Sequence, residues 1–213
     1  GWYPSTDTNR NRARARWTYY HFLGVDIEKS APRTTDPIAL ADTNNPTLNN
    51  PACTVCHESL DPVAGAYQSF GDRGLYLDQY GAMDSLPDTY KYPEWYGGEH
   101  GSSGYQEGDT WYRDMRAPGF NGEIAVGQGD SLQWLGYRIS RDPRFAAATV
   151  RFWWPAIFGA DPLTAPEDSS VPNYEQRVNA FNAQDALIQE LADKFEASGF
   201  NAKSLFADMV LSK

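Results

Sequence analysis

The segment from Cys53 to His57 constrains this chain more than any other part of the sequence, because it reads Cys-Thr-Val-Cys-His. A Cys-x-x-Cys-His run is the attachment motif of c-type haem. The two thiols become thioethers on the porphyrin, and the adjoining imidazole becomes the proximal ligand of the iron. The motif contains both cysteines of the 213-residue chain. The sequence therefore predicts one covalently attached haem c held by Cys53, Cys56 and His57.

Three other uses of a Cys-x-x-Cys pair fit the surroundings less well. A redox dithiol of the thioredoxin kind would follow a strand, whereas Asn44-Asn45-Pro46 and Asn49-Asn50-Pro51 indicate turns before the motif. A zinc site would need further ligands, and a second cysteine pair is missing from the sequence. A disulfide between Cys53 and Cys56 would close too small a loop to stabilise the chain much.

The size of the chain, 23.8 kDa with 41% apolar residues, allows a real hydrophobic core. We expect a single haem-binding domain over residues 1–213, with a haem-binding lobe at 9–129 and a helical lobe at 130–213. No run of 18 apolar residues is present, so the sequence predicts no membrane span. Because bacteria attach haem c outside the cytoplasm, the motif favours a periplasmic or extracellular location.

The net charge of −10 and the pI near 4.7 disfavour binding to nucleic acid or to anionic lipid. A basic protein partner is favoured instead. The one basic cluster places an arginine at every second position from Arg10 to Arg16. On a helix these side chains would spread around most of the circumference, which is typical of a solvated helix face. The alternative is that one of them pairs with a haem propionate.

The first half of the chain alternates between expected helices and loops. We expect a helix over residues 9–23, with Trp17, Tyr20 and Leu23 on its apolar side and Gly24 at its end. Residues 30–51 are rich in Pro, Thr, Asp and Asn, which predicts a loop. A short helix after the motif should break at Asp61-Pro62, with a second helical stretch over residues 64–70.

Residues 71–129 are rich in glycine and aromatic side chains and follow neither a helical nor a strand period. They predict an ordered, aromatic-packed loop that can include a small hairpin. The rest of the chain is helical by pattern, with apolar residues Leu187, Leu191 and Phe195 forming one stripe and with Gly159 and Gly199 at helix ends. The expected helices cover residues 130–141, 144–158, 173–198 and 202–211.

A second axial ligand would normally be Met or His. Met115 is favoured, because it lies in a loop-like string over residues 113–120 whose Pro118-Gly119 can hold the thioether in place against the iron. The alternatives are an iron without a second protein ligand and the residues Met83, His21 and His100. Met209 lies among apolar residues of the last expected helix, which favours a core methionine.

These features resemble the cytochrome c family, and more narrowly the haem-binding part of planctomycete-type multidomain cytochrome proteins. The resemblance rests on Cys53 to His57 followed by Leu60-Asp61-Pro62, on the preceding segment that ends in Phe22-Leu23-Gly24, and on C-terminal landmarks such as Phe158-Gly159. It implies a mainly α, cytochrome c-like helical haem domain. The Gly- and aromatic-rich middle would be a long loop insertion, and the C-terminal helices would be an additional segment.

The function predicted from these features is that of a mono-haem electron carrier, in which Cys53, Cys56, His57 and Met115 hold one haem and the acidic surface attracts a basic redox partner. One alternative is a peroxidase-like haem enzyme with an open distal site, for which Glu99, His100 or Arg113 could supply an acid or base. Another is an accessory haem domain of a polysaccharide-degrading system, since the chain has seven Trp and 13 Tyr.

Overall fold

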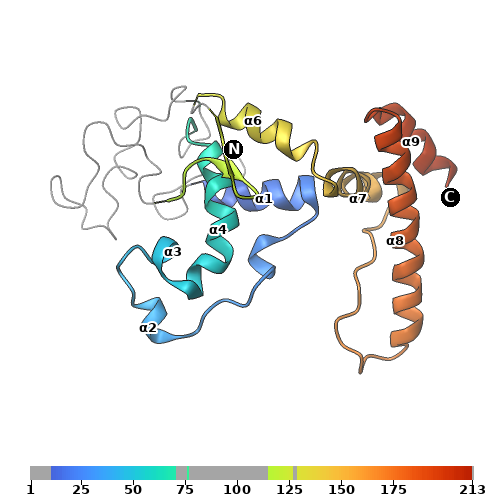
Figure 1. Ribbon diagram of the computed structural model, residues 1–213. Coiled ribbons are helices and arrows are strands. Elements are labelled where there is room, and N and C mark those ends of the chain that lie inside the picture. The colour runs from blue at the N-terminus through green and yellow to red at the C-terminus, as the bar shows by residue number, and fades with distance from the viewer. Residues whose placement is uncertain (1–10, 71–75, 77–114, 127–128, 213) are drawn as a thin grey trace. The chain divides into compact units, whose positions relative to one another are not determined.

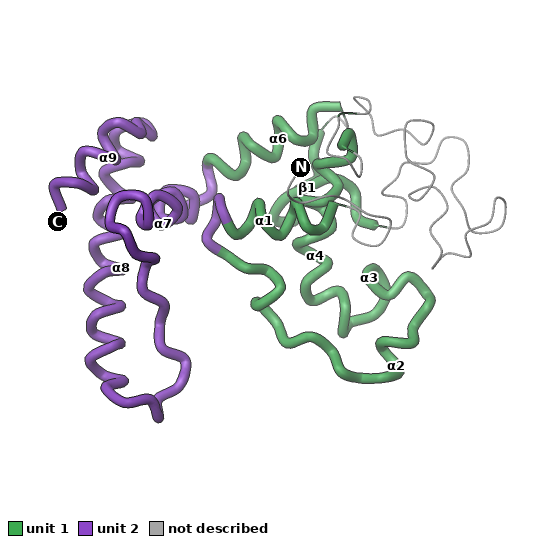
Figure 2. The backbone as a smooth tube through the Cα atoms, turned by 180° about the vertical axis from the view of Figure 1, so that it is seen from behind, with its two compact units in different colours: residues 1–20, 25–140 green, residues 21–24, 141–213 purple. Residues whose placement is uncertain are grey.

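The computed structural model describes residues 11–70, 76, 115–126 and 129–212, and this part of the chain is mainly helical with one small hairpin (Figure 1). The chain divides into two compact units (Figure 2). Unit 1 comprises residues 1–20 and 25–140, and unit 2 comprises residues 21–24 and 141–213. The predicted organisation as one domain with lobes at 9–129 and 130–213 stays a prediction.

Helix α1 (Arg12–Leu23) ends at Gly24, whose φ of +68° is the left-handed conformation that glycine adopts readily. Its buried side is formed by Ala15, Thr18, Tyr19 and Leu23. The prediction that Tyr20 lies on the apolar side is wrong, because Tyr20 is 48% exposed. Its ring instead packs edge-on against Trp17, with the ring centroids 5.4 Å apart.

The segment predicted as a loop over residues 30–51 contains two short helices. They are α2 (Pro37–Leu40) and α3 (Pro46–Asn49), and the 3-10 helix η1 (Ile27–Lys29) precedes them. Each of α2 and α3 begins at a proline, whose fixed φ and missing N–H suit the first helical position. Asp36 also caps α2 by accepting a hydrogen bond from the backbone N–H of Ile38 at 2.9 Å. The loop prediction is therefore correct only for the residues of this segment that lie outside the short helices.

Helix α4 (Pro51–Ala66) carries the Cys-x-x-Cys-His motif and runs through Pro62 without a break. The prediction that the helix ends at Asp61-Pro62 and restarts at residue 64 is therefore wrong. An interior proline removes one helical hydrogen bond and costs about 3 kcal/mol. Burial of apolar side chains on both sides of Pro62 opposes that cost, since Leu60 is 7% exposed and Val63 and Ala64 are fully buried.

A two-stranded antiparallel hairpin packs against α4. It consists of β1 (Gly119–Phe120) and β2 (Glu123–Ile124), joined by Asn121 and Gly122 with φ of +49° and +82°. Two positive φ angles are what a tight two-residue hairpin turn requires. The segment before β1 lies so close to the helix that a Cβ atom added at Gly65 would be 3.0 Å from the Pro118 nitrogen. The small hairpin predicted within residues 71–129 is thus present at 119–124, and residues 71–75, 77–114 and 127–128 lie outside the described part of the chain.

The predicted C-terminal helices are confirmed to within two residues at each end. Helix α6 (Ser131–Ile139) belongs to unit 1, and unit 2 contains α7 (Arg144–Phe158), α8 (Tyr174–Ala197) and α9 (Ala202–Leu211). Gly159 and Gly199 end α7 and α8 with φ of +74° and +70°, as expected.

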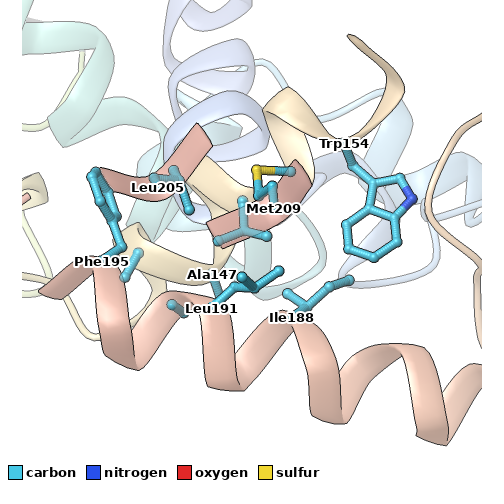
Figure 3. Packing of buried hydrophobic residues seen from close by; sticks show 10 residues of the cluster. Ala147, Trp154, Ile188, Leu191, Phe195, Leu205 and Met209 are labelled. Carbon is cyan, nitrogen blue, oxygen red and sulfur yellow. The ribbon is translucent and has the colours of Figure 1, made fainter. Parts of the chain in front are cut away.

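The core of unit 2 lies between α7, α8 and α9 (Figure 3). Leu191 and Phe195 are buried in it, and Leu187 packs against it, so the predicted apolar stripe of α8 is confirmed. Met209 is fully buried in the same cluster, which confirms it as a core methionine. Among the described residues, no helix is both long and apolar enough to cross a membrane.

Candidate haem-attachment site

Helix α4 holds the Cys-x-x-Cys-His motif in its first two turns. The side chain of Asn50 caps the helix by accepting a hydrogen bond from the Ala52 N–H at 3.0 Å, and Pro51 occupies the first helical position. Residues three and four apart lie on the same side of a helix, so Cys53, Cys56 and His57 share one side of α4. Both cysteines have free, partly exposed thiols, and α4 follows the short helix α3 rather than a strand.

The imidazole of His57 is held through one of its two nitrogens. Its Nδ1 lies 2.9 Å from Oδ1 of Asp61, one helical turn further along α4. The side chain of His57 is 22% exposed, whereas that of Asp61 is completely buried. The contact leaves Nε2 as the nitrogen that a metal or another partner can approach.

Arg12 of α1 binds the same carboxylate with a two-pronged contact. Its Nε donates to Oδ1 of Asp61 at 2.7 Å, and its Nη2 donates to Oδ2 at 3.0 Å. Burial acts to raise the pKa of Asp61, but the hydrogen bonds from His57 and Arg12 outweigh it, so this pKa lies below its ordinary value. The carboxylate is therefore ionised and can only accept hydrogen bonds, which places the proton on Nδ1 of His57.

The described arginines of the basic cluster make internal contacts, so the prediction of a solvated helix face is wrong. Arg12 pairs with Asp61, and Arg16 pairs with Asp26 and Glu28 at 2.7 Å each. Arg14 donates a hydrogen bond to the side chain of Asn11. The acidic partners of Arg12 and Arg16 come from different parts of the chain, namely Asp61 in α4 and Asp26 and Glu28 just after α1. Arg10 lies outside the described residues, and pairing with a haem propionate stays a prediction.

Met115, the predicted second axial ligand, is 5% exposed and begins the described segment that leads into the hairpin. The next residue, Arg116, has its Nη2 3.6 Å from Oε1 of Glu58, the residue after His57. A Cβ atom at Gly65 would also lie 3.3 Å from the Arg116 carbonyl oxygen. The segment that follows Met115 is thus anchored on the helix that carries the motif. The role of Met115 as an iron ligand stays a prediction.

The other sequence-predicted ligands lie either outside the described residues or in unit 2. Met83 and His100 lie outside the described residues, as do Glu99 and Arg113, the acid or base candidates of the enzyme alternative. His21 belongs to unit 2, where its ring packs edge-on against Phe152 with centroids 5.8 Å apart. Within the described ranges, no group of three or more His, Cys, Asp or Glu side chains could hold a metal ion by itself.

A pocket of about 620 Å³ lies between α4 and the hairpin. Its α4 residues are Glu58, Ser59 and Pro62, and Arg116 lines its other side. Successive residues of a helix are rotated by about 100°. These three residues therefore project from α4 on the side opposite to the mean direction of Cys53, Cys56 and His57. The pocket and the motif are separate features of the same helix.

The comparisons with known proteins found no matching family model, no similar curated protein and no similar solved structure.

Sequence reasoning missed Asp61 and Arg12 as members of this site. The available signal was the His-x-x-x-Asp spacing between His57 and Asp61, which brings two side chains together only on a continuous helix. The partnership with Arg12 joins residues 49 positions apart, and local patterns do not reveal such a contact.

Proposed function

We propose that this chain is a mono-haem c-type cytochrome domain that carries single electrons between redox partners. The observation that carries the proposal is the Cys-x-x-Cys-His motif on one side of a single capped helix, with two free thiols and with His57 held through Nδ1. This donor set fits haem c, because two thioethers and one imidazole nitrogen are what its attachment needs. The described helices would then form a cytochrome c-like core around the group, with residues 71–129 as an insertion.

When bound, the haem supplies one-electron chemistry between ferrous and ferric iron. Cys53 and Cys56 would hold the haem through two thioether bonds, and Nε2 of His57 would bind its iron. Met115 is proposed as the second axial ligand, a thioether that favours ferrous iron and raises the reduction potential relative to a second histidine. The segment after Met115 is held against α4 by the contacts at Gly65 and Glu58, which would limit its movement.

The charge of the chain supports a basic partner for the electron transfer. A net charge of −10 gives the surface a negative potential that attracts cationic surfaces and increases their association rate. Because haem c is attached outside the cytoplasm in bacteria, we propose a periplasmic or extracellular setting for this exchange.

The proposal is tested by producing the chain in a bacterium with a haem-attachment system and recording its oxidised and reduced spectra. We expect covalently bound haem, and we expect Cys53→Ala or Cys56→Ala to reduce attachment. A near-infrared iron–methionine band should be present and should vanish in Met115→Leu, which keeps the side-chain volume but removes the sulfur. Met209→Leu is the matched control, since Met209 is a buried core residue of unit 2, and it should leave the band unchanged.

Two results would contradict the proposal. Absence of covalent haem in the unmodified chain would refute haem attachment altogether. A high-spin iron that ignores Met115→Leu and reacts with peroxide would refute the electron carrier and favour the peroxidase-like alternative.

A further inference from the structure

The carboxylate of Asp61 is a buried charge that haem attachment by Cys53, Cys56 and His57 does not by itself require. It is completely buried and has two charged or polar partners, Nδ1 of His57 and the guanidinium of Arg12. Removing a carboxylate from water is costly, and such a group is retained only where specific hydrogen bonds compensate for it. All of its described partners lie on α1 and α4, so the arrangement connects two helices at the side chain predicted to bind iron.

We propose that Asp61 and Arg12 form a positioning pair for His57, which fixes the ring and its tautomer and sets the reduction potential of the attached haem. This inference rests on the proposed function. Asp61 acts directly on the imidazole, and Arg12 acts through Asp61.

The geometry supports fixation of the ring. Asp61 accepts from Nδ1 at 2.9 Å, while Arg12 holds both carboxylate oxygens at 2.7 and 3.0 Å. The carboxylate therefore cannot turn without losing a hydrogen bond to Arg12, and the imidazole cannot turn without breaking its hydrogen bond to Asp61. A planar, bidentate arginine contact is well suited to this task because it fixes orientation as well as distance. Nε2 is thereby directed away from Asp61 before any haem arrives.

The charges support an effect on the iron. A carboxylate that accepts from the free N–H of a metal-bound histidine increases the basicity of that ligand. A more basic ligand stabilises ferric iron over ferrous iron, which lowers the reduction potential. The Arg12 cation withdraws part of that negative charge and therefore acts in the opposite direction. The two residues should consequently shift the potential with opposite signs, which a loss of packing alone would not produce.

The test measures the reduction potential of the haem-loaded chain in Asp61→Asn and Arg12→Gln. Asp61→Asn keeps the shape and one acceptor oxygen, and we expect it to change the ferric-to-ferrous preference about tenfold, which raises the potential by about 59 mV for one electron. Arg12→Gln should lower the potential. Asp26→Asn and Arg16→Gln are the matched controls, because they make the same charge changes in another ion pair of α1 and should shift the potential much less.

Shifts of the same sign in Asp61→Asn and Arg12→Gln would overturn the inference, as would shifts no larger than those of the two controls. Arg12→Gln leaves a buried carboxylate with fewer partners and could prevent folding. Arg12→Lys then keeps the cation without the bidentate contact, and it should lower the potential below that of the unmodified chain, the direction opposite to Asp61→Asn. An unchanged potential in Arg12→Lys together with an unchanged potential in Asp61→Asn would also refute the pair.

A second measurement separates this inference from the proposed function. Nitrogen-15 NMR of the haem-free chain at pH 8 reports which imidazole nitrogen of His57 carries the proton. We expect protonation at Nδ1 in the unmodified chain and a smaller Nδ1-protonated fraction in Asp61→Asn. A ring protonated at Nε2 in the unmodified chain would refute the positioning role even if haem attaches normally. Correct protonation in a chain that never attaches haem would instead refute the proposed function alone.

Discussion

The contact between Gly65 of α4 and the segment after Met115 gives a quantitative test of how the predicted axial ligand is held. In Gly65→Ala the new Cβ would lie 3.0 Å from the Pro118 nitrogen, 3.1 Å from its Cα and 3.3 Å from the Arg116 carbonyl oxygen. All three neighbours are backbone atoms, so the Arg116–Pro118 segment has to move away from the helix. Overpacking of this kind costs about 1–3 kcal/mol. Replacing a helical glycine by alanine contributes about 1 kcal/mol in the opposite direction.

Gly136 in α6 is the matched control for this substitution. It is also a helical glycine of unit 1, and an added Cβ there would meet no heavy atom within 4 Å. Gly136→Ala should therefore show only the propensity effect and increase the free energy of unfolding by about 1 kcal/mol. Gly65→Ala should be less stable than Gly136→Ala by the overpacking cost of about 1–3 kcal/mol.

Urea unfolding monitored by circular dichroism measures the stability of both variants, and the near-infrared spectrum of the haem-loaded chain reports on Met115. We expect Gly65→Ala to weaken the methionine band and Gly136→Ala to leave it unchanged. Equal stabilisation by the two substitutions would refute the close approach of Pro118 to α4. A destabilised Gly65→Ala with a full methionine band would refute the idea that this approach positions Met115.

Two further predictions concern acid and the core of unit 2. The pKa of Asp26 is lowered chiefly by its hydrogen bond with Arg16, and that of Asp61 is lowered because its hydrogen bonds outweigh burial. Their contribution to stability is complete above the ordinary aspartate pKa of about 3.9 and is lost as the pH falls through their lowered folded values. The free energy of unfolding should thus decrease as the pH falls below about 4, and it should decrease less in Asp61→Asn than in the unmodified chain. Identical pH profiles for the two proteins would contradict this. Leu191→Ala should destabilise unit 2 by about 2–5 kcal/mol, measured by urea unfolding, with an unchanged haem spectrum.

The C-terminal helices could be predicted from the sequence because their signals are local. The stripe of Leu187, Leu191 and Phe195 recurs every four residues, and Gly159 and Gly199 end their helices in the left-handed conformation. Tyr20 shows the limit of such reasoning. Its spacing from Trp17 suggested a shared buried face, but the neighbour Tyr19 packs inward and donates to the Ser59 carbonyl oxygen of α4 at 3.3 Å. The partner helix determines which side of α1 is buried, and the sequence of α1 alone does not contain that information.

The wrong prediction of a helix end at Asp61 and the omission of Asp61 from the site have one physical origin. Proline at position 62 suggested a helix end at Asp61, and with the helix ended there, Asp61 would have no fixed relation to His57. In the structure the helix continues, and continuity is what places Asp61 one turn beyond His57 and within 2.9 Å of its Nδ1. Burial of the apolar residues that flank Pro62 opposes the local cost of the proline. The contact between Asp61 and His57 therefore depends on the tertiary packing that keeps α4 helical through Pro62. The local sequence around Pro62 does not reveal that packing.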